Sequence, residues 1–158
     1  MDDVLSAPPL MTLNLKHIFD APIEHVFAAW TNTELLAEWF GPENFTVTTA
    51  NINLQVGGKY LLILQSPEGK NIEHSGKYVE INPPTKLIFT WLLADQACGG
   101  CENQLTETLV SIHFKPIGRT TEIMLTHERL PSKEACAGHE FGWNSSFNSL
   151  KTFLLTVH

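Results

Sequence analysis

The sequence predicts an α+β fold in which a curved antiparallel sheet of about six to seven strands wraps around one long C-terminal helix. Three observations predict this fold. A strand-like segment is followed by two short helical patterns, the chain from Phe45 to Glu128 has a period of two, and Ser132 to His158 carry an apolar stripe at helical spacing. Because such a sheet must cover its apolar face, we expect the last helix to lie across it.

The length and the net charge of the chain limit its possible functions. A chain of 158 residues has the size of one domain, so we expect a flexible tail over residues 1–11 and a single domain over residues 12–158. Seventeen acidic and ten basic residues give a formal net charge of −7, which disfavours nucleic acid and anionic membranes as partners. Neither a secretory signal nor a stretch of ~20 apolar residues is recognised, so a soluble, cytoplasmic protein is expected.

The first elements are expected to be a strand and two short helices. Alternate side chains from Leu13 to Phe19 share one face, as in a strand. Asp20-Ala21-Pro22 then predicts the start of a helix, with the Asp20 carboxylate as its cap and the proline in its first turn. A second helix is predicted to begin at Asn32 or Thr33 and to stop at Gly41-Pro42.

Turn signals rich in glycine and proline divide the next part of the chain into about six strands. The expected strands are Asn51–Val56, Lys59–Gln65, Ser75–Ile81, Leu87–Leu93, Thr106–Phe114 and Thr121–His127. Their spacing is typical of an antiparallel meander, in which strands that follow each other in the sequence pair with each other. Pro131-Ser132 is expected to end the sheet and to cap the final helix.

The final helix carries its apolar stripe at steps of three and four residues. The stripe consists of Cys136, His139, Trp143, Phe147, Leu150 and Leu154. Small residues flank its middle, namely Gly138, Gly142, Ser145, Ser146 and Ser149. Because these side chains are too small to fill the space beside the stripe, we predict a cavity between the helix and the sheet.

The expected ligand is a small hydrophobic or amphipathic molecule that binds without being chemically changed. The expected ligand-binding residues are Trp143, Phe147 and Leu150 on the helix, Tyr60, Tyr78, Phe89 and Trp91 on the strands, and His139 and His127 as polar groups. Each of them could instead be an ordinary core residue. His139 could equally bond a loop at the helix start, and His127 could be a satisfied histidine at the end of a strand.

Catalysis is a less favoured interpretation. Glu128 and Glu140 are the carboxylates nearest in sequence to these histidines, and acid–base chemistry would need such a pair within reach of one substrate proton. The sequence contains no nucleophile-elbow, phosphate-binding glycine loop or H-E-x-x-H motif. A hydrolase or cyclase that uses His127, His139 or a nearby glutamate stays an alternative to simple binding.

Several short sequence motifs occur in a characteristic order. They are Ala21-Pro22 leading to Val26-Phe27 and Ala29-Trp30-Thr31, Leu35 to Pro42, Val56 to Tyr60, Gly76 to Ile81 with Pro83, Leu87 to Trp91, Thr126-His127-Glu128, and His139 with Gly142-Trp143. In order and spacing they resemble the activator of heat-shock-protein-90 ATPase homologue (AHSA-type) family of the START-like (SRPBCC) superfamily, over residues 12–156. The resemblance implies a helix-grip fold with a hydrophobic cavity. It also suggests a chaperone-interacting module and leaves a homodimer contact open.

The cysteines depart from the pattern of that family. Cys98-Gly99-Gly100-Cys101 together with Cys136-Ala137-Gly138-His139 offers three thiolates and one imidazole, enough for a tetrahedral zinc site. Cys98 and Cys101 could instead form a redox pair or be plain loop cysteines, and Cys136 also suits a small core position. Zinc is therefore the one cofactor that the sequence suggests, and otherwise none is expected.

Overall fold

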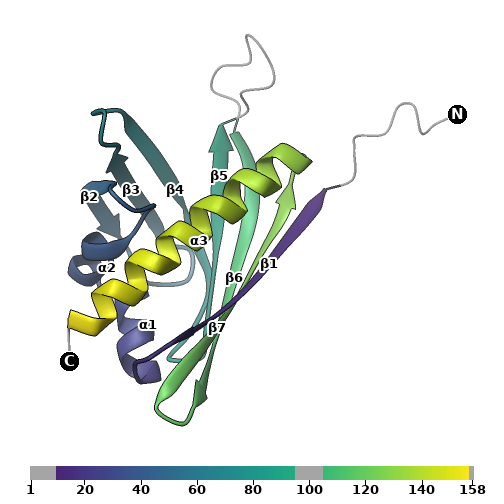
Figure 1. Ribbon diagram of the computed structural model, residues 1–158. Coiled ribbons are helices and arrows are strands. Elements are labelled where there is room, and N and C mark those ends of the chain that lie inside the picture. Colours follow the sequence, from purple (N-terminus) through teal and green to yellow (C-terminus); the bar gives the residue numbers. More distant parts are fainter. Residues whose placement is uncertain (1–9, 95–104, 157–158) are drawn as a thin grey trace, which may run out of the picture.

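The computed structural model describes residues 10–94 and 105–156, and within them it confirms an α+β fold with a seven-stranded antiparallel sheet (Figure 1). The strands are β1 (Met11–Phe19), β2 (Thr46–Ile52), β3 (Lys59–Gln65), β4 (Asn71–Asn82), β5 (Lys86–Ala94), β6 (Leu105–Ile117) and β7 (Thr120–Leu130). The helices are α1 (Ile23–Thr31), α2 (Thr33–Trp39) and α3 (Lys133–Thr156). Of the predicted tail 1–11, residues 1–9 lie outside the described residues and Met11 begins β1.

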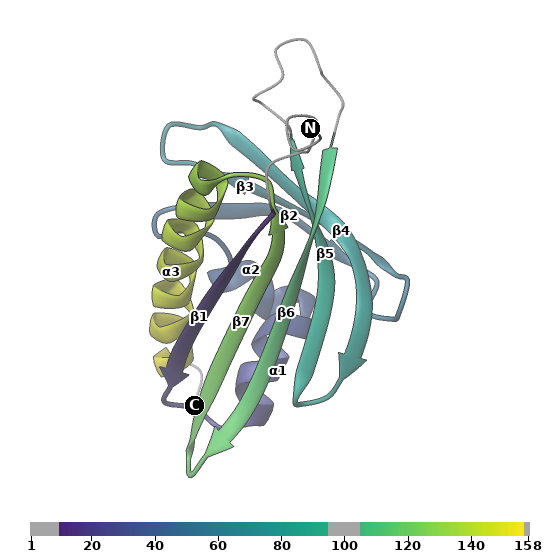
Figure 2. The ribbon, with the colours of Figure 1, turned by 90° about the vertical axis from the view of Figure 1, so that its right-hand side faces the viewer.

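The strand order is β1-β7-β6-β5-β4-β3-β2, so that β2 to β7 form the predicted meander and β1 returns to pair with β7. Figure 2 shows the curved sheet from its outer side, with α1 and α2 behind the strands. The long α3 runs diagonally across the inner side in Figure 1 and contacts β1, β7 and α2. None of the described helices is long and apolar enough to cross a membrane.

The helix starts agree with the sequence at α2 and α3 but not at α1. The Asn32 side chain accepts a hydrogen bond from the first turn of α2 at 3.1 Å, and Ser132 does the same for α3 at 3.0 Å. At α1, the cap position is Pro22 and no side chain caps the helix, so the predicted Asp20 cap is wrong. The fixed φ of Pro22, −66°, already directs the chain into the helix.

The predicted strand Asn51–Val56 is wrong in its bounds, since β2 spans Thr46–Ile52. The Asn53 amide still donates to the Lys59 carbonyl across from β3 at 3.0 Å, but the chain then turns: the Gln55 amide donates back to the Asn53 carbonyl at 2.8 Å, and Gly57 has a φ of 84°. A positive φ favours glycine and ends the extended conformation. The turn therefore begins before the Val-Gly-Gly signal, whereas the other predicted strands all lie within observed ones.

The apolar stripe of α3 packs as predicted along most of its length. Trp143, Phe147, Leu150 and Leu154 are each at most 3% exposed, and they face the core between helix and sheet. The two residues near the helix start, Cys136 and His139, are half-buried. The stripe thus closes the core at the C-terminal end of α3 and leaves it open near the N-terminal end.

Candidate functional site

A cavity of about 340 Å³, partly open to solvent, lies beside the N-terminal half of α3. Its walls come from α3, from the segment that follows α2, and from β3, β4 and β5. The lining residues are Phe40, Gly41, Pro42, Phe45, Leu64, Ile72, His74, Trp91, Ala135, Gly138, His139, Gly142, Trp143 and Ser146. Its volume lies in the range of small-molecule binding sites.

Two glycines keep the helical wall of the cavity bare. Gly138 and Gly142 stand one turn apart on α3, and a Cβ placed on either of them would meet no atom within 4 Å. Glycine inside a helix destabilises it relative to alanine by roughly 0.5–1 kcal/mol. These two positions therefore lower the stability of α3 and leave the space beside it open. Opposite them, Gly41 has a φ of 103° and turns the chain after α2, which brings Phe40 to the cavity wall.

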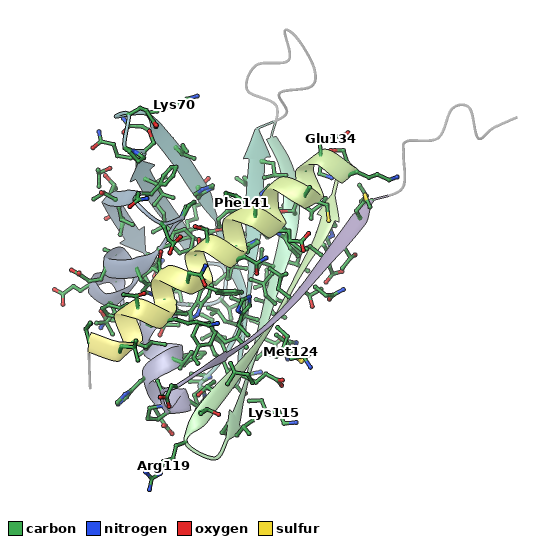
Figure 3. The ribbon with its side chains drawn as sticks, viewed as in Figure 1. Lys70, Lys115, Arg119, Met124, Glu134 and Phe141 are labelled. Atoms are coloured by element: carbon green, nitrogen blue, oxygen red, sulfur yellow. The ribbon has the colours of Figure 1, made fainter. Side chains whose placement is uncertain are left out.

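The cavity lining carries no formal charge. Among the described residues, none of the Asp, Glu, Lys or Arg side chains borders it. Figure 3 shows that Lys70 and Arg119 lie at the tips of the β3–β4 and β6–β7 hairpins, away from the helix–sheet gap. The polar groups at the cavity are therefore neutral ones, chiefly the rings of His74 and His139 and the hydroxyl of Ser146.

His139 is held as one neutral tautomer. Its Nε2 accepts from the Trp91 indole N–H at 3.2 Å, and its Nδ1 lies 2.8 Å from the Ala135 carbonyl. An indole N–H can only donate and a carbonyl can only accept, so Nε2 carries no proton and Nδ1–H donates to Ala135. Both ring nitrogens are thereby engaged inside the protein.

His127 is held as the opposite tautomer. The Trp143 indole N–H donates to its Nδ1 at 3.1 Å, so its proton is on Nε2, which donates to the Thr108 hydroxyl at 2.7 Å. Thr108 in turn donates to the Trp91 carbonyl at 2.6 Å. Hydrogen bonds thus link Trp143, His127, Thr108 and the Trp91 carbonyl, whereas the Trp91 indole separately bonds His139. The two imidazole centroids lie 5.0 Å apart.

Burial keeps these histidines neutral. Desolvation, and secondly the charge that His139 would carry, lower the pKa of His127 to about 3 and that of His74 to about 4. Desolvation also lowers the pKa of His139, although its bond to Ala135 opposes the shift. His74 stacks on Trp91 with centroids 4.4 Å apart, which removes one ring face from water.

The structure distributes the predicted ligand-binding residues over three places. Trp91, His139 and Trp143 border the cavity, whereas Phe147, Leu150 and His127 are fully buried and do not border it. Tyr60, Tyr78 and Phe89, together with Trp91, line a second and much smaller cavity of about 20 Å³. These two cavities share only part of their walls, so the predicted set does not converge on a single volume.

Sequence reasoning missed the walls opposite the helix, above all Phe40, Phe45 and His74. The sequence did contain a signal for His74: it lies an even number of residues from Ile72 and Tyr78, so all three share one face of β4. No comparable signal marked Phe45, which lies in an irregular segment before β2. Its place at the cavity follows from how that segment packs, and local sequence does not encode this.

The predicted zinc ligands are only partly described. Cys98 and Cys101 lie outside the described residues, while Cys136 packs against the core. Ligation by the Nε2 of His139 would require release of the Trp91 hydrogen bond. Within the described residues no group of three or more metal-ligating side chains is assembled. Glu128 is half-buried and Glu140 is exposed, and neither borders the cavity.

Comparison with known proteins supports the fold and the family. The family model described as "Activator of Hsp90 ATPase homolog 1-like protein" matches residues 20–154. The mouse (Mus musculus) protein "Activator of 90 kDa heat shock protein ATPase homolog 2" is 28% identical over 125 residues, which is 78% of this chain and 31% of that protein. The chain therefore spans about a third of the length of this relative.

Solved structures show the same architecture. The crystal structure of an AHSA1 protein from Silicibacter pomeroyi has a TM-score of 0.80 and 27% identity, covering 94% of this chain and 100% of that one. A protein from Nitrosomonas europaea has a TM-score of 0.75 at 22% identity, covering 91% of this chain and 94% of that one, and shows the fold alone. The curved sheet around a long C-terminal helix is the START-like helix-grip fold.

Proposed function

Because this chain belongs to the Activator of Hsp90 ATPase homolog 1-like protein family, whose name alone assigns no ligand, we propose from its cavity that it binds a small apolar or amphipathic molecule. The observation that carries this proposal is the 340 Å³ cavity with its aromatic walls and its bare helical face. Ligand sites are typically concave, mostly apolar and provided with a few polar groups. This cavity has all three properties.

The hydrogen bonds around the cavity support binding rather than catalysis. Both nitrogens of His139 and the indole N–H groups of Trp91 and Trp143 are engaged with other protein groups. A general acid or base must be free to exchange a proton with the substrate near neutral pH. The lowered pKa values of the histidines and the position of both glutamates away from the cavity favour a passive site.

Binding can be tested with a neutral fluorescent probe, N-phenyl-1-naphthylamine, whose emission rises in apolar surroundings. We expect saturable enhancement with the wild-type protein and its loss in Gly142→Phe, because the added ring would occupy the cavity. Asn148→Phe is the matched control, since it places the same ring on the exposed face of α3. Equal enhancement in both variants, or none in the wild type, would contradict the proposed function.

A second candidate function is docking on a heat-shock protein 90 chaperone. The family match over residues 20–154 and the name of the mouse relative favour it. A docking surface would lie outside the cavity, and Phe141, 75% exposed on α3, is a suitable residue to test (Figure 3). Stimulation of chaperone ATPase activity that survives Gly142→Phe but is lost in Phe141→Ser would support docking; no stimulation by the wild type would exclude it.

A further inference from the structure

A second cavity lies deeper in the molecule, beneath α1 and α2. It has a volume of about 20 Å³, which is room for one group the size of a water molecule. It is lined by Trp30, Leu36, Phe40, Tyr60, Leu62, Tyr78, Leu87, Phe89 and Trp91. We refer to it as the inner cavity, and to the 340 Å³ cavity as the outer cavity.

One residue that lines the inner cavity, Trp30, carries an indole N–H that has no acceptor among the described residues. The chain has four tryptophans, and three of their indole N–H groups donate to protein atoms: Trp39 to the Ala29 carbonyl, Trp91 to His139 and Trp143 to His127. The Nε1 of Trp30 is buried and has no partner among the described residues, in a side chain that is 3% exposed. Buried donors are nearly always paired, because an unpaired one destabilises the fold.

Two aromatic residues among those described line both cavities. Phe40 and Trp91 border both of them, and their ring centroids lie 6.2 Å apart at an angle of 53°. Phe40 follows the last residue of α2 and precedes Gly41, so it stands at the end of a helix rather than inside one. Phe40 is therefore part of the wall that the two cavities share.

The inner cavity suits an uncharged oxygen. None of the described Asp, Glu, Lys or Arg residues lines it, and burial raises the pKa of Tyr60 and that of Tyr78, so both phenols are neutral. A carboxylate placed there would lose its hydration without gaining a counter-charge. A carbonyl oxygen needs only a donor, and the Trp30 N–H is one.

We propose that the inner cavity is the far end of the ligand site, and that a ligand in the outer cavity places a small uncharged carbonyl oxygen past Phe40 to accept a hydrogen bond from the Trp30 Nε1–H. This inference rests on the proposed function and narrows its ligand to apolar molecules that carry an uncharged carbonyl group. The outer cavity supplies contact area, and the inner cavity supplies selectivity.

The test compares two probes of nearly equal shape, 2-acetylnaphthalene and 2-isopropenylnaphthalene, which differ by a carbonyl oxygen in place of a methylene group. By titration calorimetry, we expect the ketone to bind the wild type about tenfold more tightly, the effect of one net hydrogen bond. The preference should vanish in Trp30→Phe and persist in Trp39→Phe, whose indole N–H donates to Ala29. In ¹⁵N–¹H spectra, the Trp30 indole resonance should move downfield with the ketone alone.

Each outcome decides the inference. Three results would overturn the inner subsite while leaving the outer cavity as a binding site: equal affinity of the wild type for both probes, a ketone preference that survives in Trp30→Phe, or binding of N-phenyl-1-naphthylamine without binding of either naphthalene probe. Failure of both probes, together with failure of N-phenyl-1-naphthylamine, would overturn the proposed function itself. Should Trp30→Phe not fold, 3-(3-benzothienyl)alanine at this position keeps the shape of the indole and removes its N–H.

Discussion

Acid should destabilise this protein through its buried histidines. Burial lowers the pKa of His127 to about 3 and that of His74 to about 4, while an unfolded chain has histidine pKa values near 6.5. The unfolded state therefore takes up protons more readily than the folded state as the pH falls. Stability should be complete above about pH 6.5, and should decline below it until the folded-state pKa of each ring is reached.

The size of the loss between pH 7.5 and pH 5 follows from this difference. At pH 5 both folded-state pKa values lie below the pH, so the folded rings stay neutral. The unfolded rings are protonated, because pH 5 lies about 1.5 pH units below their pKa. At about 1.4 kcal/mol per pH unit, each ring lowers the free energy of unfolding by roughly 2 kcal/mol, and the two rings together lower it by roughly 4 kcal/mol.

Urea denaturation at pH 7.5 and pH 5, followed by tryptophan fluorescence, measures this loss. His127→Gln should be less stable than the wild type at pH 7.5, because it breaks the bonds to Thr108 and Trp143, but its further loss at pH 5 should be smaller by roughly 2 kcal/mol. The exposed His113 provides a control, and His113→Gln should lose as much as the wild type. An identical acid loss in wild type and His127→Gln would refute the reasoning.

Three further predictions concern the same region. Gly142→Ala should raise the free energy of unfolding by roughly 0.5–1 kcal/mol, since its Cβ meets no atom within 4 Å, and an unchanged or lower melting temperature would argue against an open helical wall. Thr108→Val should lower stability by roughly 1–3 kcal/mol in urea denaturation, because it leaves the Nε2–H of buried His127 without its acceptor; a neutral effect would contradict the hydrogen bond between Thr108 and His127. If the zinc prediction is right, protein purified without a histidine tag carries about one zinc per chain and Cys98→Ser loses it, whereas metal-free wild-type protein excludes the site. The predicted ligands are Cys98, Cys101, Cys136 and His139.

The elements that sequence predicted well are those encoded by short-range chemistry. The start of α2, predicted at Asn32 or Thr33, and the predicted cap of α3 at Ser132 each depend on one side chain that accepts from an amide three residues later, and both bonds are present. The stripe of α3 depends on helical spacing, and its buried face follows that spacing from Trp143 to Leu154. The failed cap at Asp20 and the shifted β2 lie where two local signals competed, and the proline and the early turn prevailed.

The candidate site was less accessible from the sequence. The sequence predicted Tyr60, Tyr78 and Phe89 as ligand-binding residues together with Trp143, but it could not show that they border a different volume. The tautomers of His127 and His139 depend on indole groups 16 and 48 residues away in the chain. Such pairings are set by how strands and helices pack, and no local pattern encodes them.

The amino-acid sequence by itself therefore determined the order of elements, the amphipathic face of α3 and the small residues beside it, because each depends on residues within one or two turns or along one strand. Only the tertiary structure decided which aromatic rings close the core and which enclose space. It also decided that three indoles find acceptors while that of Trp30 finds none in the described part of the chain. Cavities and buried hydrogen bonds are properties of surfaces brought together from distant parts of the chain, and they come into being only when the sheet curves around the helix.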